Sequence, residues 1–166
     1  MLTLTSSAFA PGATIPARYT CAGADVSPPL VWSGGPVGTR TFALVVDDPD
    51  APDPAAPKRV WVHWVLYNVP ADVGALPEGA SGRGLPPGAR EGRNDGGAVG
   101  WSGPCPPIGR HRYFHKLYAL DAALPDLGDR ATKADLERAM QGHVLASAEL
   151  VGTFSVDDRR AAGDRP

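Results

Sequence analysis

The abundance of glycine and proline constrains the fold of this chain more than any other feature of its sequence. The chain has 20 glycines and 18 prolines, which are 38 of its 166 residues. Both residue types interrupt helices, so a mostly helical fold is excluded. Because 43% of the residues are hydrophobic, the chain still has enough apolar surface for a packed core. Short strands joined by turns and long loops satisfy both facts.

Length, charge and the first residues narrow the class of protein. A chain of 166 residues with 16 basic and 18 acidic side chains suits one domain without a basic surface. We therefore expect no nucleic-acid partner. Residues 1–7 contain no basic segment followed by an apolar run, and no stretch of about 18 apolar residues occurs anywhere. The sequence predicts a cytoplasmic protein with no membrane span.

Apolar runs predict at least six strands. The run at 41–46 is continuous and the run at 60–69 is apolar on both faces, so both are expected in the middle of a sheet. The first of these strands is expected to end where Asp47 begins. Because helical crossovers are lacking, the sheet is predicted to be antiparallel. The predicted strands are residues 2–5, 30–32, 41–46, 60–69, 110–120 and 144–154.

One helix and one long loop complete the expected domain. Thr132 and Asp135 resemble a capping box and predict a helix over residues 133–140. Residues 74–109 contain eleven glycines and almost no periodicity, and so long a loop usually builds a binding surface. We predict a single domain over residues 1–156 and a flexible carboxy-terminal tail over residues 157–166.

The two cysteines have no spacing that identifies a metal or redox site. Cys21 and Cys105 lie far apart in loop-like sequence. In a protein expected to be cytoplasmic, the favoured prediction is two reduced thiols. A disulfide is the less favoured alternative.

Several common sites do not fit the sequence. The glycine-rich stretch at 82–88 does not match a dinucleotide-binding loop, and residues 100–104 do not match the turn that carries a hydrolase serine. Asp48, His63 and His111 could form a site with two histidines and one carboxylate, but no supporting motif accompanies them. We expect neither a metal nor a cofactor.

Two other histidines are expected outside any binding site. His115 shares a strand face with His111 but lies about 13 Å further along at the usual strand rise, so it should belong to another layer. His143 follows the predicted helix, and we expect it to be capping or solvated.

Polar side chains stand at the edges of three hydrophobic strands. Asp48 follows one strand, His63 lies in the next, and His111 and Tyr113 share one face of a third, about 6.6 Å apart. Trp61 lies on the same face as His63 and would supply an apolar wall. If the strands are neighbours, a carboxylate, two imidazoles and a phenol surround one pocket.

A set of short motifs follows a fixed order along the chain. They are CAGADVSPPL at 21–30 with Trp32, DPDAP at 48–52, WVHW at 61–64, GRND at 92–95, GPCPP at 103–107 and HRY at 111–113. In these motifs the chain resembles the phosphatidylethanolamine-binding protein family, in particular its bacterial Raf kinase inhibitor-like branch. The resemblance runs from about residue 20 to residue 154.

The resemblance implies a mainly β fold: a central antiparallel Greek-key sheet, a second smaller sheet, and one or two short helices. It also implies a small anion-accepting pocket near the surface. Carried over by motif, the pocket carboxylate is Asp48, the imidazoles are His63 and His111, the hydroxyl donor is Tyr113 and the wall is Trp61. The rim is formed by Cys105, Pro106 and Pro107.

The resemblance also shows two departures from animal members of the family. They have a glycine where this chain has Cys105, a change typical of the bacterial branch that is expected to narrow the mouth of the pocket. They also continue into a longer carboxy-terminal helix, whereas this chain ends soon after Phe154. We expect the pocket to be more open on that side, and a kinase-inhibitory role becomes harder to transfer.

The residues themselves suggest how such a pocket would work. No Lys or Arg stands at its predicted base, so an anion would rely on neutral donors or on imidazoles that become cationic near or below pH 6.5. Affinity is therefore expected to rise on mild acidification. Asp48 is expected to bond an imidazole and hold its N–H toward the ligand, or to accept from an ammonium group. Arg112 is expected to pair with Asp50.

Three functions are compared. The leading one is a non-enzymatic protein that binds a small phosphorylated or anionic ligand, such as a phospholipid head group. The second is an interaction module that inhibits a kinase or protease through the glycine-rich loop. The third is a hydrolase that uses Asp48 and the two histidines, which the absence of an evident nucleophile disfavours. The sequence leaves open whether the protein forms a homodimer.

Overall fold

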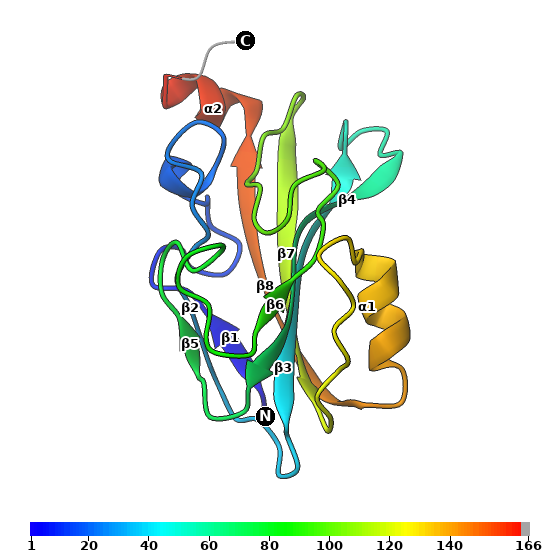
Figure 1. Cartoon of the computed structure of the whole chain (residues 1–166). Helices are drawn as coiled ribbons and strands as arrows, with labels where there is room; N and C mark the ends of the chain where they lie inside the picture. The colour runs from blue at the N-terminus through cyan, green and yellow to red at the C-terminus, as the bar shows by residue number, and fades with distance from the viewer. Residues whose placement is uncertain (164–166) are drawn as a thin grey trace.

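A computed structural model of the chain describes residues 1–163. It is mainly β, with two antiparallel sheets and a few short helices, as the sequence predicts (Figure 1). The larger sheet has the strand order β6-β4-β3-β7-β8, and the smaller has the order β1-β2-β5. The strands are β1 (Thr3–Thr5), β2 (Leu30–Ser33), β3 (Thr41–Ala51), β4 (Arg59–Pro70), β5 (Ala75–Leu76), β6 (Arg90–Glu91), β7 (Arg110–Leu120) and β8 (Val144–Ser155). The helices are the 3-10 turn η1 (Ala17–Tyr19), α1 (Lys133–Met140) and α2 (Val156–Ala161).

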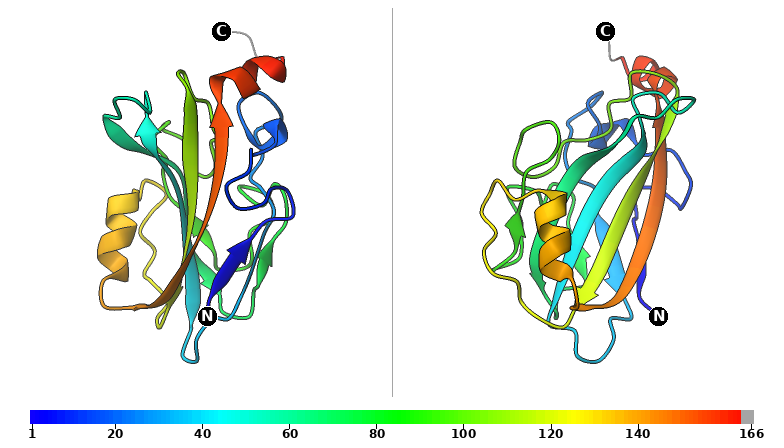
Figure 2. Two further views of the ribbon diagram at one scale, coloured as in Figure 1. Left: turned by 180° about the vertical axis from the view of Figure 1, so that it is seen from behind. Right: turned by 90° about the vertical axis from the view of Figure 1, so that its right-hand side faces the viewer.

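The central sheet separates two hydrophobic cores. Phe42, Leu44 and Val46 of β3 pack toward the smaller sheet, whereas Ala43 and Val45 belong to the core under α1. This alternation follows from the two-residue period of a strand. Figure 2 shows α1 on one face of the sheet and the smaller sheet on the other. Because β3 is covered on both faces, its continuous apolar run is explained.

Strand β3 is longer than predicted. It continues past Val46 to Ala51, and its extension pairs with β4 through Asp48↔Trp61 and Ala51↔Arg59. The acidic residues do not end the strand because each finds a partner. The carboxylate of Asp48, for example, accepts the backbone N–H of Asp50 at 2.7 Å. This extension carries Asp48 to one end of the sheet.

The predicted helix at 133–140 is confirmed, with Thr132 and Asp135 forming the capping box. The strand expected at 144–154 is also confirmed as β8. The first part of the expected flexible tail is different, because it forms α2. Ser155 and Asp158 form a second capping box that starts this helix, while residues 164–166 lie outside the described part of the chain.

The long glycine-rich loop at 74–109 is anchored rather than slack. The Glu91 carboxylate accepts the Trp64 indole N–H and the Ser81 hydroxyl, both at 2.6 Å. The side-chain amide of Asn94 donates to the Gly100 carbonyl oxygen at 2.9 Å. Such bonds from side chains to the backbone hold irregular segments in one conformation. Among the described residues, no helix is both long and apolar enough to cross a membrane.

Candidate functional site

A cavity of about 430 Å³ opens at the end of the central sheet where β3 finishes and β7 begins. This is the end of the molecule next to α2, opposite the amino terminus in Figure 1. All eight residues predicted for the site line the cavity, and seven further residues line it as well. The lining residues are Cys21, Asp25, Asp48, Ala51, Pro52, Trp61, His63, Gly96, Ser102, Gly103, Cys105, Pro106, Pro107, His111 and Tyr113.

Asp48 and His111 form a buried pair in the wall of the cavity. The Asp48 carboxylate oxygen Oδ2 lies 2.6 Å from Nδ1 of His111, and the His111 side chain is only 1% exposed. The other ring nitrogen, Nε2, lies 2.9 Å from the carbonyl oxygen of Ile108. Both ring nitrogens therefore lie beside oxygen atoms, Oδ2 of Asp48 and the carbonyl oxygen of Ile108. The predicted bond to Asp48 is confirmed, but the prediction that the second N–H points to a ligand is wrong, because Ile108 takes it.

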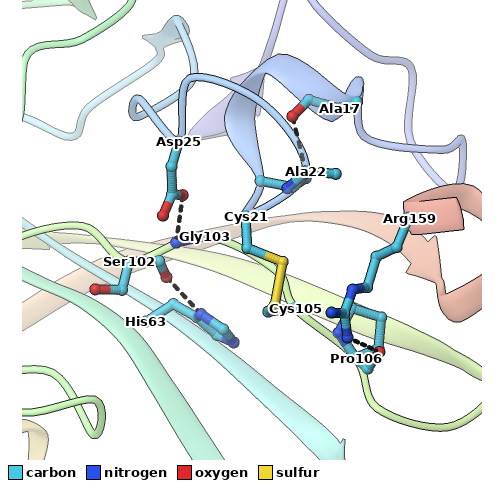
Figure 3. The surroundings of a disulfide bond; sticks show 11 residues. Ala17, Cys21, Ala22, Asp25, His63, Ser102, Gly103, Cys105, Pro106 and Arg159 are labelled. Atoms are coloured by element: carbon cyan, nitrogen blue, oxygen red, sulfur yellow. Dashed lines mark hydrogen bonds between the residues drawn. A yellow bond between two sulfur atoms is a disulfide. The ribbon is translucent and has the colours of Figure 1, made fainter. Parts of the chain in front are cut away.

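His63 differs from His111 in the role of its Nε2 atom. Its Nδ1–H donates to the Ser102 carbonyl oxygen at 2.6 Å, which leaves Nε2 as the acceptor in the neutral ring (Figure 3). Burial lowers the pKa of His63 below its usual value. The ring is therefore neutral at pH 7. It becomes a second donor only at a pH lower than the sequence led us to expect.

Tyr113 and Trp61 supply the aromatic walls. Tyr113 packs edge-on against His63, with ring centroids 5.3 Å apart. Burial, and next the charge of Asp48, raise the pKa of Tyr113, so its hydroxyl stays protonated and can donate. Trp61 is half-buried, and the guanidinium of Arg59 lies 4.6 Å from the centroid of its ring.

The rim contains a disulfide between Cys21 and Cys105, with 5.4 Å between their Cα atoms (Figure 3). The favoured prediction of two reduced thiols is therefore wrong. The two loops meet because Gly103 packs directly on the turn after η1: a Cβ at this position would lie 2.3 Å from the carbonyl oxygen of Tyr19. Only a glycine allows this close approach. Pro106 and Pro107 also line the cavity.

Asp25 is the main functional candidate that the sequence reasoning missed. It lines the cavity, and its Oδ1 accepts the backbone N–H of Gly103 at 2.8 Å. Desolvation raises the pKa of Asp25. The available signal was its place inside the CAGADVSPPL motif, followed by the Ser-Pro-Pro that ends this loop. It gives the cavity a second carboxyl group at the edge, while Asp48 lies deeper.

The cavity wall is acidic. Among the lining residues the structure shows two carboxylates and, as predicted, no Lys or Arg. Arg112 instead grips Asp50 outside the cavity, with nitrogen–oxygen distances of 2.9 and 3.0 Å, so this predicted pair is confirmed. Within residues 1–163, no group of three or more His, Cys, Asp or Glu side chains is arranged to hold a metal ion.

The remaining two histidines lie outside the cavity. His115 is fully buried between the sheets and packs on Phe9 and Trp101, in a different layer from His111 as predicted. Burial lowers its pKa to about 4. His143 is exposed at the other end of the molecule, where its Nδ1 lies 2.8 Å from a carboxylate oxygen of Asp121.

A protein-family model matches most of the chain. The model for the family described as phosphatidylethanolamine-binding protein matches residues 5–155. Similar curated relatives are the UPF0098 protein of Methanothermobacter thermautotrophicus, 48% identical over 92% of this chain and 98% of its own length, and that of Chlamydia muridarum, 44% identical over 93% and 99%.

Two solved structures resemble the fold closely. One is a phosphatidylethanolamine-binding protein homolog from Chlamydia trachomatis, with a TM-score of 0.83 and 41% identity over 93% of this chain and 97% of the other. The second is Escherichia coli YbcL, described as a member of the mammalian family, with a TM-score of 0.85 and 34% identity over 93% and 98%. Both similarities extend over most of the chain.

Proposed function

Because the chain belongs to the phosphatidylethanolamine-binding protein family, we propose that it is a non-enzymatic binding protein whose cavity takes a small phosphorylated compound with an amine, such as a phospholipid head group. The observation that carries this proposal is the joining of Asp48, His63, His111 and Tyr113 around one cavity. Small-ligand sites typically combine an apolar wall with a few convergent polar groups.

The amine end of such a ligand has acceptors in the cavity. The carboxylates of Asp48 and Asp25 are the charged groups of the lining, and an ammonium group would donate to them. The ring of Trp61 beside them adds an aromatic face, which attracts cations. A bare anion would instead be repelled by the two carboxylates.

The phosphate end has few donors, and all of them carry no charge at pH 7. The Tyr113 hydroxyl is one. The backbone N–H of Cys105 is another, since the described residues show no acceptor for it. At lower pH, protonation of His63 adds Nε2 as a third donor, and this donor is charged. We therefore expect weak binding at neutral pH that strengthens on acidification, at a pH below about 6.5 because burial lowers the pKa of His63.

Titration of the full-length protein with phosphoethanolamine tests the proposal, followed by the ring resonances of all four histidines. The rings of His63 and His111 are expected to shift, while those of His115 and His143 serve as internal controls because they lie outside the cavity. Equal shifts in all four rings indicate non-specific binding. Unshifted His63 and His111 rings at millimolar ligand contradict the proposed function.

The sequence predicts a cytoplasmic location, but the disulfide favours another compartment. The Cys21–Cys105 disulfide is typical of oxidising surroundings, since the thiol pool of the cytoplasm keeps most cysteines reduced. Cell fractionation with thiol labelling tests the two together: a cytoplasmic protein is expected to carry both cysteines as thiols.

A further inference from the structure

We propose that the Cys21–Cys105 disulfide is a reversible thiol-exchange site that controls how tightly the cavity holds its ligand. This inference rests on the proposed function, because it concerns the same cavity. Both cysteines line that cavity, and their bond joins the loop after η1 to the loop that leads into β7. The disulfide is therefore part of the ligand site and not a structural cross-link elsewhere in the fold.

The two sides of the disulfide are held in place by different contacts. On one side, the segment 102–104 has several other anchors. The N–H of Ser102 donates to the His63 carbonyl oxygen at 3.1 Å, and the N–H of Gly103 donates to Asp25 at 2.8 Å. The N–H of Cys21 donates to the Pro104 carbonyl oxygen at 3.1 Å. These bonds do not depend on the disulfide, so reduction is expected to leave this segment and the fold intact.

The backbone of segment 105–107 makes fewer hydrogen bonds to the rest of the described chain, although Pro106 is buried. Besides the disulfide, its backbone is fastened by Nη1 of Arg159, which donates to the Pro106 carbonyl oxygen at 2.9 Å. Figure 3 shows the disulfide between the Asp25–Gly103 bond on one side and the Arg159–Pro106 bond on the other. Reduction therefore removes the covalent anchor from the part of the rim that faces the ligand. A freed rim must be ordered again on binding, which costs conformational entropy.

The disulfide is also accessible to a reductant. Cys105 is exposed, whereas Cys21 is half-buried. Exposed disulfides are the ones that thiols reduce most readily. The Sγ of Cys105 is therefore the expected point of attack.

The chemistry needs a small dithiol or a protein dithiol as reductant. Its first thiolate attacks Sγ of Cys105, the S–S bond breaks, and Cys21 leaves as a thiolate that takes up a proton. The second thiolate of the reductant then attacks the mixed disulfide, which releases Cys105 as a thiol and the reductant as a disulfide. Two electrons pass from the dithiol to the protein, and the reverse sequence restores the bond.

Ligand binding and the redox state of the disulfide are therefore expected to be coupled. Loss of order in the rim is expected to weaken ligand binding by about tenfold. By linkage, saturating ligand then favours the disulfide by the same factor. For a two-electron couple, a tenfold factor lowers the reduction potential by about 30 mV.

The experiment titrates phosphoethanolamine into the full-length protein before and after reduction with dithiothreitol, with circular dichroism to follow the fold. The oxidised form is expected to bind about tenfold more tightly, and both forms are expected to be folded. The double variant Cys21→Ser/Cys105→Ser should bind like the reduced protein and should not respond to dithiothreitol, which controls for effects of the reductant itself. The potential of the wild-type disulfide, measured in glutathione buffers with and without phosphoethanolamine, gives the second readout.

Each outcome decides between the two proposals. Equal affinity of the oxidised and reduced proteins contradicts the redox inference and leaves the proposed function standing. Binding by neither form contradicts the proposed function, and the redox inference with it. Unfolding of the wild-type protein on reduction would also overturn the inference, because the whole fold would then depend on the disulfide.

Discussion

Asp47 and Asp48 are neighbours on β3 with nearly the same burial, 0% and 3% exposed. Their carboxylates nevertheless contact different partners on opposite faces of the sheet. Asp47 points to the α1 face, where Lys116 and Lys133 place their ammonium groups 3.0 and 2.8 Å from its Oδ2. Asp48 points to the cavity and pairs with the imidazole of His111. The period of the strand alone sends them to opposite faces.

The partner of a buried carboxylate decides what that carboxylate can do. Burial alone would lower the pKa of Lys133, but the hydrogen bond and charge of Asp47 outweigh it and raise the pKa. Lys133 therefore keeps its charge at physiological pH, and Lys116 places a second ammonium group beside the same carboxylate. Asp48 is instead paired with His111 in the wall of a cavity, so it belongs to a site that a ligand can reach.

The largest expected effect is the loss of stability in Asp47→Asn. This variant leaves two partly buried lysines without their counter-charge, which is expected to lower the free energy of unfolding by about 3 kcal/mol. Urea denaturation measures it. As a control, Asp126→Ala breaks the exposed pair with Arg90 and should cost less than about 1 kcal/mol. Similar losses in the two variants would remove the distinction between a buried cluster and a surface pair.

Acidification gives the next largest effect, because burial lowers the pKa of His115 on β7, whereas Asp47 raises the pKa of Lys133. The folded-state pKa of His115 is about 4, below its unfolded value of about 6.5. The folded protein therefore binds this proton more weakly. The stability is complete above pH 6.5 and is lost as the pH falls toward 4, by about 2 kcal/mol between pH 7 and 4.5.

Denaturation at several pH values, in the wild type and in His115→Gln, isolates this contribution from that of other groups. The variant is expected to lose less stability than the wild type over the same pH range. If the pH dependence of the two proteins is the same, His115 is not the source. His63, whose pKa is also lowered by burial, adds to the dependence in the same direction.

Ligand affinity separates the two aspartates directly. Asp48→Asn keeps the shape of the side chain and removes its negative charge, so phosphoethanolamine binding is expected to fall about tenfold through loss of the charge that attracts the amine. Asp47→Asn is the matched control on the opposite face and should bind within about twofold of the wild type, measured on the folded fraction. Equal affinity in the two variants would show that Asp48 does not contact the ligand.

The smallest effect is expected for Arg112→Ala. Arg112 is 55% exposed in its side chain and pairs with Asp50 outside the cavity. Its removal is expected to cost about 1 kcal/mol of stability and to change phosphoethanolamine affinity by less than about twofold. Denaturation and the same titration measure both. A loss of affinity as large as that of Asp48→Asn would place Arg112 in the ligand site.

Much of the fold was predictable from the sequence because its signals are local. The alternation along 110–120 and the Thr132–Asp135 pair each specify a structure within a few residues. The site was predictable where strand periodicity puts two groups on one face, as with His111 and Tyr113. The extension of β3 was not predicted because an Asp-Pro-Asp segment is typical of the end of a strand. The partners that hold these carboxylates inside the sheet cannot be identified from the sequence.

The rest depended on contacts between distant segments. The Cys21–Cys105 bond spans 84 residues of loop sequence, and no local spacing identifies such a pair. The direction of the second His111 nitrogen was set by a single carbonyl oxygen, that of Ile108. Asp25 belongs to a loop that reaches the cavity only because Gly103 lets the backbone of the opposite loop approach it.

The order of strands in the larger sheet has a consequence for synthesis on the ribosome. Strand β3 pairs on one edge with β4, which follows it closely in the sequence. Its other edge pairs with β7, which is synthesised much later, as in the pairing of Asp47 with Phe114. Until that later segment leaves the exit tunnel, the nascent chain exposes an apolar strand edge that can pair with other chains. A chaperone that shields this edge would raise the yield of native protein most when translation pauses before residue 110.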